Sequence, residues 1–124
     1  MINHYSRGAP YAGSEDNLQM ATAQIVALHR DLIAFHTPNG GLRNFVVAAK
    51  LKRMGTLPGV SDWLILKKTK NFSGACIELK VKKGSLSKPQ IEFLERAEKE
   101  GYFTAVAWSI EGFQEALLKF LNDK

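Results

Sequence analysis

Eight consecutive residues alternate strictly in character: Ala75-Cys76-Ile77-Glu78-Leu79-Lys80-Val81-Lys82. Alanine, isoleucine, leucine and valine occupy one set of alternate positions, and cysteine, glutamate and two lysines occupy the other. Because successive side chains of a strand point to opposite faces, this pattern predicts a half-buried strand with one apolar and one polar face. Glu78 and Lys80 then project from the same polar face.

A second strand is expected just before this one. The run Trp63-Leu64-Ile65-Leu66 is apolar and has strand length, and the polar residues 67–73 that follow it are typical of a turn. A hairpin centred near Lys70 pairs residues whose numbers add up to 140, which places Asp62 opposite Glu78. Opposed side chains have Cβ atoms about 4.5–5.5 Å apart, so the two carboxyl groups are expected to be neighbours.

A long helix is expected ahead of the hairpin. Ser14 is typical of an N-cap, and Glu15 in the first turn suits the helix dipole. Apolar residues at helical spacing from Leu18 to Phe35 predict one helix over this whole stretch. The turn cluster at 36–41, which contains proline and two glycines, is expected to end it.

The remaining elements follow from caps, turns and apolar spacing. They are helices over about residues 44–54, 87–100 and 109–121, and a buried strand over 102–108. The resulting order, α-α-β-β-α-β-α, predicts an α/β fold in which helices flank a small mixed β-sheet. Residues 14–124 are expected to form a single domain, and residues 1–13, which lack periodicity, an irregular N-terminal arm.

Charge is concentrated in the middle of the chain. The 124 residues carry 17 lysines and arginines against 12 acidic residues, a formal net charge of +5. Residues 43–88 alone contain eleven basic residues and only two acids, Asp62 and Glu78. A cationic block of this kind favours a polyanionic partner, most simply nucleic acid. The alternative is a lysine-rich face that is only solvated.

Several classes of protein lack support. A single cysteine, Cys76, excludes an intrachain disulfide framework and is typical of a reducing, intracellular compartment. No apolar run approaches the roughly 18 residues of a membrane helix, and the N-terminus lacks a secretory apolar segment. His4, His29 and His36 have no zinc-site spacing, and no phosphate-binding glycine motif is present. Cys76 is interpreted as a packed thiol.

The two isolated acids indicate a metal site. Two neighbouring carboxylates repel each other unless a proton or a cation lies between them. Mg²⁺ binds carboxylate oxygens and keeps further positions for water and phosphate. Lys80, on the face of Glu78, could orient a nucleophilic water or neutralise charge that develops on a phosphate. The alternative is a solvent-exposed strand face with scattered charges.

Three motifs together resemble the VRR-NUC (virus-type replication-repair nuclease) family of the PD-(D/E)XK, restriction-endonuclease-like superfamily. They are Gly59-Val60-Ser61-Asp62, Ile77-Glu78-Leu79-Lys80 and Gly84-Ser85-Leu86-Ser87-Lys88-Pro89-Gln90. The likeness extends over about residues 14–121 and includes Glu15 and Gln19, residues 38–41 and 52–55, and Gly101-Tyr102. One departure is Ser61, where the family usually has proline before the aspartate.

The resemblance implies a restriction-endonuclease-like core and a Mg²⁺- or Mn²⁺-dependent endodeoxyribonuclease. It implies Asp62, Glu78 and the backbone carbonyl of Leu79 as metal ligands, Lys80 as the catalytic lysine, Gln90 as an auxiliary residue, and Glu15 near the metal. Two of these residues have plainer interpretations. Gln90 completes an S-x-x-Q capping box with Ser87, and Glu15 suits the helix dipole.

The resemblance also implies the partners. Stand-alone members of this size, mostly from phage, resemble homodimeric resolvases of four-way (Holliday) DNA junctions, which implies a phage-encoded protein in a bacterial cytoplasm. No membrane and no nucleotide cofactor are expected. The expected DNA contacts are Asn39, Arg43, Lys50, Lys52, Arg53, Lys82, Lys83 and Lys88. The alternatives are a flap or nonspecific nuclease of the same chemistry, a non-catalytic DNA-binding module, and a merely solvated turn at the last three lysines.

Overall fold

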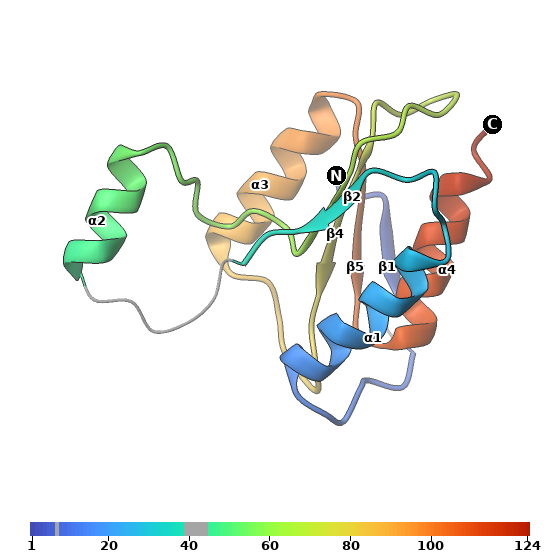
Figure 1. Ribbon diagram of the computed structural model, residues 1–124, viewed down its shortest axis with the longest axis horizontal. Coiled ribbons are helices and arrows are strands. Elements are labelled where there is room, and N and C mark those ends of the chain that lie inside the picture. Colours follow the sequence, from blue (N-terminus) through green and yellow to red (C-terminus); the bar gives the residue numbers. More distant parts are fainter. Residues whose placement is uncertain (7, 39–44) are drawn as a thin grey trace.

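The computed structural model describes residues 1–6, 8–38 and 45–124. Asn39 and Arg43, two of the predicted DNA contacts, lie outside the described residues. The elements follow one another as β1 (His4–Ser6), α1 (Glu15–Ala27), β2 (Ala34–His36), α2 (Phe45–Arg53), β3 (Trp63–Ile65), β4 (Ala75–Leu79), α3 (Lys88–Lys99), β5 (Phe103–Ala107) and α4 (Ile110–Leu121) (Figure 1).

The strands of the described residues form one five-stranded mixed sheet in the order β1-β5-β4-β3-β2. β1, β5 and β4 run parallel to one another, whereas β3 is antiparallel to both β4 and β2. Trp63 pairs with Ile77 and Ile65 pairs with Ala75, so the predicted register of the hairpin is confirmed. The predicted α/β fold, a small mixed sheet flanked by helices, is confirmed as well.

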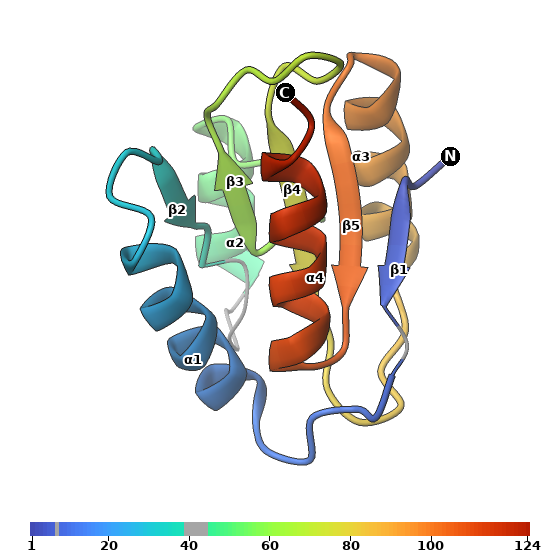
Figure 2. The same ribbon diagram turned by 90° about the vertical axis from the view of Figure 1, so that its right-hand side faces the viewer.

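Helices cover both faces of the sheet. α1 and α4 lie side by side over one face, and α3 lies over the other (Figures 1 and 2). The rings of Trp63 and Phe113 lie 6.1 Å apart, which joins β3 to α4. The indole N–H of Trp63 donates to Thr22 Oγ1 of α1 at 3.0 Å. One indole therefore fixes both helices of this layer against the hairpin that carries Asp62.

Residues 1–13 were expected to be irregular, and this is wrong for β1. β1 pairs with β5 along His4–Ser6, and Ile2 beside it is buried. The Asn3 side chain accepts from the Thr104 backbone N–H at 3.0 Å, which fixes the register of the pairing. A three-residue strand is too short to show an apolar period, and its hydrogen bonds depend on a partner a hundred residues away.

The first helix is shorter than expected. It ends at Ala27, and β2 occupies residues 34–36, which were expected to close the helix or form a turn. The N–H of Leu66 donates to the Ile33 carbonyl at 2.8 Å, and the N–H of Thr37 donates to the Asp62 carbonyl at 2.9 Å. Pairing with β3 thus satisfies this backbone, although the side-chain spacing also fits a helix.

β4 is more buried than predicted, because the sequence pattern indicated a strand with one solvated face. It ends at Leu79, and all five of its residues are buried. The two faces alternate as predicted, but α3 covers the face of Cys76 and Glu78, where Leu94 and Trp108 pack. Glu78 is therefore a buried carboxylate and not one on a solvated face. Within the described residues, no helix is long and apolar enough to cross a membrane.

Candidate metal and nucleic-acid site

Asp62 and Glu78 meet at the open end of the β3–β4 hairpin. The backbone N–H of Asp62 donates to Glu78 Oε1 at 3.2 Å, and the backbone N–H of Leu79 donates to Asp62 Oδ2 at 2.7 Å. Only 3% of the Glu78 residue surface is exposed. Each carboxylate is therefore held by the backbone of the strand that carries the other, and register alone brings them together.

The pair does not readily carry two negative charges. Burial raises the pKa of Glu78 to about 8, the charge of Asp62 raises it as well, and Lys80 opposes the rise. Burial also raises the pKa of Asp62, and the hydrogen bond from the Leu79 N–H opposes that rise. Two neighbouring carboxyl groups repel each other less when one of them carries a proton. A cation could replace this proton.

Lys80 lies beside the pair. Its Nζ is 3.6 Å from Glu78 Oε2, and only 12% of its side chain is exposed. The backbone N–H of Lys80 donates to the Ala107 carbonyl at 2.9 Å, which continues the pairing of β4 with β5 beyond Leu79. Lys80 is therefore fixed both at its backbone N–H and at its ammonium group, which lies next to the Glu78 carboxyl group.

The sequence left Gln90 with two possible roles, one in the capping box of α3 and one beside the site, and its side chain makes both contacts. Its Oε1 accepts from the Ser87 backbone N–H at 2.9 Å, and Ser87 Oγ accepts from the Gln90 N–H at 3.3 Å, so the capping box is complete. Its Nε2 donates to Glu78 Oε2 at 2.9 Å. The start of α3 is thereby linked directly to the carboxylate pair.

The loop before Asp62 is fitted closely to α3. Gly59 has a φ of +82°, and a Cβ there would clash with the Pro89 carbonyl. Ser61 is fully buried, and its hydroxyl donates to the Trp63 carbonyl at 3.0 Å. At the position where the family that the motifs resemble usually has proline, a side-chain hydrogen bond therefore stabilises the turn into β3.

His36 and Thr37 also contact this loop, and sequence reasoning missed them. His36 Nδ1 lies 3.0 Å from the Asp62 carbonyl oxygen, and the Thr37 hydroxyl donates to the Ser61 carbonyl. In the sequence, His36 was noted only as the first residue of the turn cluster and for its lack of zinc-site spacing. Its position depends on the β2–β3 pairing, so no local signal marked it as a contact of the Asp62 loop.

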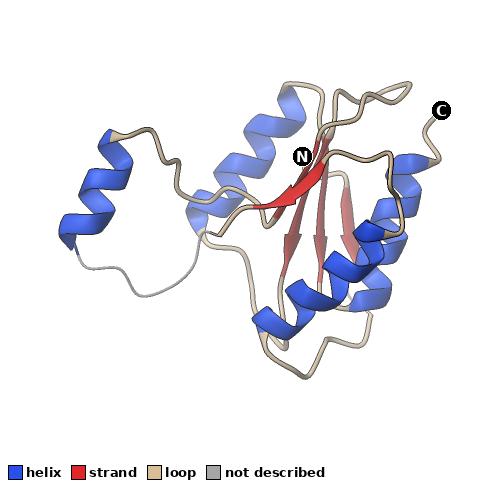
Figure 3. Cartoon of the chain, viewed as in Figure 1, coloured by secondary structure: helices blue, strands red, loops and turns tan. Residues whose placement is uncertain are grey.

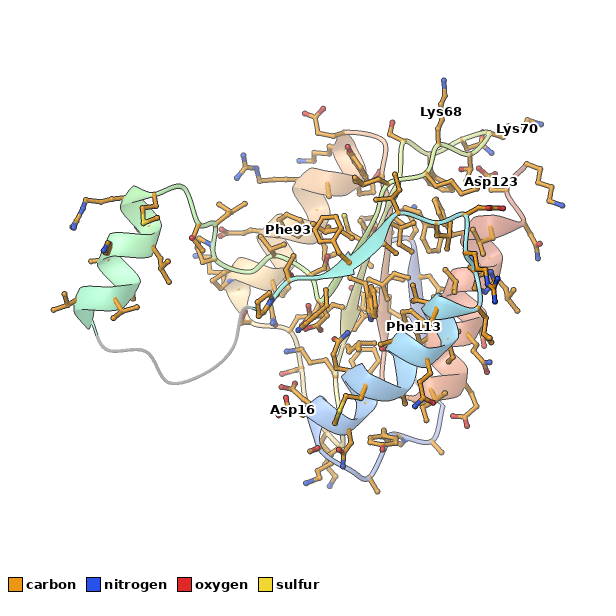
Figure 4. All side chains as sticks on the ribbon, viewed as in Figure 1. Asp16, Lys68, Lys70, Phe93, Phe113 and Asp123 are labelled. Carbon is orange, nitrogen blue, oxygen red and sulfur yellow. The ribbon has the colours of Figure 1, made fainter. Side chains whose placement is uncertain are left out.

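Glu15 is not brought to the pair by any hydrogen bond or ion pair of the described residues. It is exposed in the first turn of α1, behind the N-cap Ser14, whose hydroxyl accepts from the Asn17 N–H at 3.1 Å. Asp16, its neighbour, points away from the body at this end of α1 (Figure 4). The role of Glu15 near a metal stays a prediction.

The predicted DNA contacts fall on two described surfaces. Lys50, Lys52 and Arg53 are exposed on α2. Lys82 and Lys83 are exposed on the segment between β4 and α3, and Lys88 is exposed at the first residue of α3. Lys82 and Lys83 line a hollow of about 260 Å³ against Trp108, whose indole N–H donates to the Gly84 carbonyl at 2.7 Å. This lysine segment therefore packs against the residue that follows the carboxyl end of β5.

The donor set fits a hard divalent cation. Within the described residues, no group of three or more His, Cys, Asp or Glu side chains could hold a metal ion. Two carboxylates and one backbone carbonyl nevertheless match Mg²⁺, which is bound through few protein oxygens and keeps several waters. The raised pKa values of the buried Asp62 and Glu78 carboxyl groups mark this as a place where positive charge is needed.

Among the comparisons with known proteins, the one with solved structures agrees with this architecture. No protein-family model and no curated protein matches the sequence. One solved structure, described as a VRR_NUC domain protein, aligns with a TM-score of 0.71 at 22% identity, over 86% of this chain and 88% of its own. At this identity the likeness concerns the fold. The chain has the restriction-endonuclease-like α/β fold of that VRR_NUC domain protein.

Proposed function

We propose that this chain is a metal-dependent DNA endonuclease of the VRR-NUC family that cuts branched DNA, with the four-way junction as its preferred substrate and a homodimer as its active form. The observation that carries the proposal is the buried Asp62–Glu78 pair with Lys80 and Gln90 beside it. The resemblance of the motifs supports the junction, the dimer and a phage-encoded protein in the bacterial cytoplasm. The fold supports the nuclease class of the proposal.

The residues divide the chemistry of phosphodiester hydrolysis among them. Asp62, Glu78 and the Leu79 carbonyl would hold Mg²⁺ or Mn²⁺. When bound, the metal supplies charge neutralisation at the phosphate and a more acidic water. Lys80 orients the attacking water or stabilises the charge that develops on the phosphate. The resemblance to the family implies products that carry a 5′-phosphate. Gln90 holds Glu78 in its ligating orientation.

Cationic residues around this centre bind the backbone of the substrate. Lys82 and Lys83 come soon after Glu78 and Lys80 in the chain, and Lys88 begins α3, so these cations are placed for the phosphates that flank the cut. Two symmetric nicks across a four-way junction require two active sites, for which a twofold dimer is the simplest arrangement.

Nicking assays test the proposal. Labelled four-way junctions, 5′ flaps and linear duplexes are incubated with the protein in Mg²⁺, Mn²⁺ or EDTA. We expect metal-dependent nicking, with junctions cut first and nicks in symmetric pairs. Glu78→Gln and Lys80→Ala should each reduce nicking by at least about 100-fold while junction binding is kept. The matched controls are Glu95→Gln and Lys99→Ala, at exposed positions on α3.

The outcomes separate the alternatives. A wild-type protein that binds junctions but does not nick them with either metal would be a non-catalytic binding module. Faster cutting of flaps, or equal cutting of every substrate, would keep the chemistry and replace the junction by flaps or by nonspecific DNA.

A further inference from the structure

Tyr5 places an exposed aromatic ring on the same face of the sheet as Glu78. Tyr5 of β1 and Glu78 of β4 both pair with Val106 of β5, the strand that lies between them. Residues that pair in this way point to the same face, and two strand spacings separate their Cα atoms by about 10 Å. β1 forms one edge of the sheet (Figures 2 and 3). At this edge, 47% of the Tyr5 surface is exposed.

Trp108 supports the ring of Tyr5. The two ring centroids lie 6.4 Å apart, and the ring planes are inclined by 26°, which is a stacked arrangement. Trp108 itself is buried, and its indole N–H donates to the Gly84 carbonyl at 2.7 Å. The ring of Tyr5 is therefore held against a fixed partner, while almost half of the residue surface stays open to solvent. A ring that is already oriented loses little conformational freedom when a ligand stacks on it.

Lys82 and Lys83 lie next to this pair of rings. Both lysines line the hollow of about 260 Å³ to which Trp108 and Pro10 contribute the apolar wall. The Lys82 N–H donates to the Tyr11 carbonyl at 3.2 Å, and the Tyr11 N–H donates to the Trp108 carbonyl at 2.7 Å. These bonds fix the lysine segment relative to the rings. Cations that follow a nucleic-acid backbone, together with aromatic rings on which bases stack, are the combination that binds single strands.

The other side of Tyr5 is unsuited to a phosphate backbone. There Tyr5 borders a second hollow, of about 460 Å³, whose wall includes Glu111 and Glu115 of α4. α4 lies over the face of the sheet opposite to α3, so these carboxylates repel a polyanion from that side (Figure 2). The approach from the candidate metal site passes Lys82 and Lys83 instead. A strand that reaches both the metal site and Tyr5 therefore runs along the face of α3, over the lysine segment.

We propose that Tyr5, supported by Trp108, is a stacking subsite for an unstacked base of the DNA, and that Lys82 and Lys83 bind the phosphates of the same strand. The inference rests on the proposed nuclease function and names the feature by which branched DNA is recognised. Inside a continuous duplex both faces of each base are covered by its neighbours, whereas a branch point or a single strand exposes a base face. A rise of about 3.4 Å per nucleotide places a base at Tyr5 on the order of three nucleotides from the cut.

Fluorescence of 2-aminopurine tests the subsite without cutting, because this adenine analogue loses emission when it stacks on an aromatic ring. The analogue is placed in turn at each nucleotide near the branch point of a four-way junction and in a short single strand, with Ca²⁺ in place of Mg²⁺. We expect the wild type to quench one or two adjacent positions and Tyr5→Phe to keep this quenching. Tyr5→Leu, which keeps an apolar contact with Trp108 but has no ring, should lose the quenching and weaken single-strand binding by about 5–100-fold.

Phe35→Leu is the matched control, because Phe35 is 42% exposed on β2, at the opposite edge of the sheet. This variant should quench the analogue and bind single strands as the wild type does. The affinity of all variants for a continuous duplex should be nearly equal, since the subsite meets no open base face there. Circular dichroism establishes that every variant is folded.

Two results would overturn the subsite. The first is a wild type that quenches the analogue at no position near the branch point, and the second is quenching that Tyr5→Leu retains in full. Mg²⁺-dependent nicking of junctions is measured separately with the same variants. A wild type that quenches through Tyr5 but never nicks keeps the subsite and removes the nuclease, whereas a wild type that nicks junctions without any quenching keeps the nuclease and removes the subsite.

Discussion

Gln90 shows how one side chain can serve the fold and the site together. Its carbonyl oxygen completes the capping box of α3, and its amide nitrogen donates to Glu78. The sequence could indicate the cap, because Ser87 and Gln90 are three residues apart. It could not indicate the second contact, because that depends on where α3 crosses β4. The two interpretations of Gln90 therefore do not exclude each other.

Comparison of the two cap residues separates the roles. Gln90→Ala removes one half of the cap and the contact with Glu78, whereas Ser87→Ala removes only the other half of the cap. Both should cost about 1 kcal/mol of unfolding free energy. Only Gln90→Ala should also lower metal affinity or nicking rate, by about 10–100-fold. Urea unfolding and calorimetric Mg²⁺ titration measure the two effects, and equal losses of function in both variants would leave Gln90 with the cap alone.

The pKa of Glu78 makes the stability of the metal-free protein depend on pH. A carboxyl group whose pKa is raised from its ordinary 4.5 to about 8 on folding favours the native state below pH 4.5, and this advantage is lost as the pH rises through about 8. We expect Glu78→Gln to become more stable than wild type over this window, by at most about 1.4 kcal/mol per pH unit.

Urea unfolding in EDTA at pH 5, 7 and 9 measures this difference. Glu95→Gln, at an exposed position, serves as the control and should follow the wild type. Mg²⁺ should stabilise the wild type at pH 9 and leave Glu78→Gln unchanged, because the metal replaces the proton. A stability difference that does not vary with pH would contradict the raised pKa.

At the scale of elements, the sequence predicted what local pattern and caps determine. The register of the β3–β4 hairpin, and with it the meeting of Asp62 and Glu78, followed from alternation and the position of the turn. The caps at Ser14 and Ser87 are present as expected, and Ser109 caps α4 at the start of the helix predicted over residues 109–121. These features depend on contacts over a few residues, or on one hairpin, and so they can be recognised in the sequence.

The edge strands could not be predicted in this way. β1 and β2 have three residues each, and they are stabilised by pairing with β5 and β3. Leu32 and Phe35 continue the apolar spacing of α1, yet the chain leaves the helix at Ala27. The contacts of His36 with the Asp62 loop were missed for the same reason, since they exist only once β2 has paired.

The close contact between the Asp62 loop and α3 can be tested at Gly59. Gly59→Ala introduces a Cβ where φ is +82° and where the Pro89 carbonyl leaves no room. We expect a loss of about 1–3 kcal/mol in unfolding free energy, together with weaker metal binding as Asp62 is displaced. Gly8→Ala is the control, because nothing lies within 4 Å of a Cβ at that position. Equal behaviour of the two variants in urea unfolding would show that the contact is not restrictive.

Across the whole molecule, the fold divides the cationic block into separate surfaces. Lys82 and Lys83 lie on the segment just after the strand of the carboxylates. Lys68 and Lys70 lie at the closed end of the hairpin, opposite Asp62 and Glu78, where Figure 4 shows them beside Asp123. The Asp123 carboxylate accepts from the Asn71 backbone N–H at 2.7 Å, which stabilises this turn. Net charge alone would have assigned all of these lysines to DNA.

Salt dependence of DNA binding distinguishes the two lysine pairs. If Lys82 and Lys83 contact phosphates beside the cut, their double substitution by alanine removes two of the cations that release counterions from DNA. The slope of log K against log salt should then become shallower by about 1.8, and binding should weaken alike on all sequences. The matched control is the double substitution of Lys68 and Lys70, which removes the same charge at the other end of the hairpin and should leave the slope almost unchanged. Fluorescence anisotropy with Ca²⁺ in place of Mg²⁺ measures binding without cutting. If both pairs change the slope equally, DNA covers both ends of the sheet, and the lysines next to Glu78 have no special part in holding the substrate.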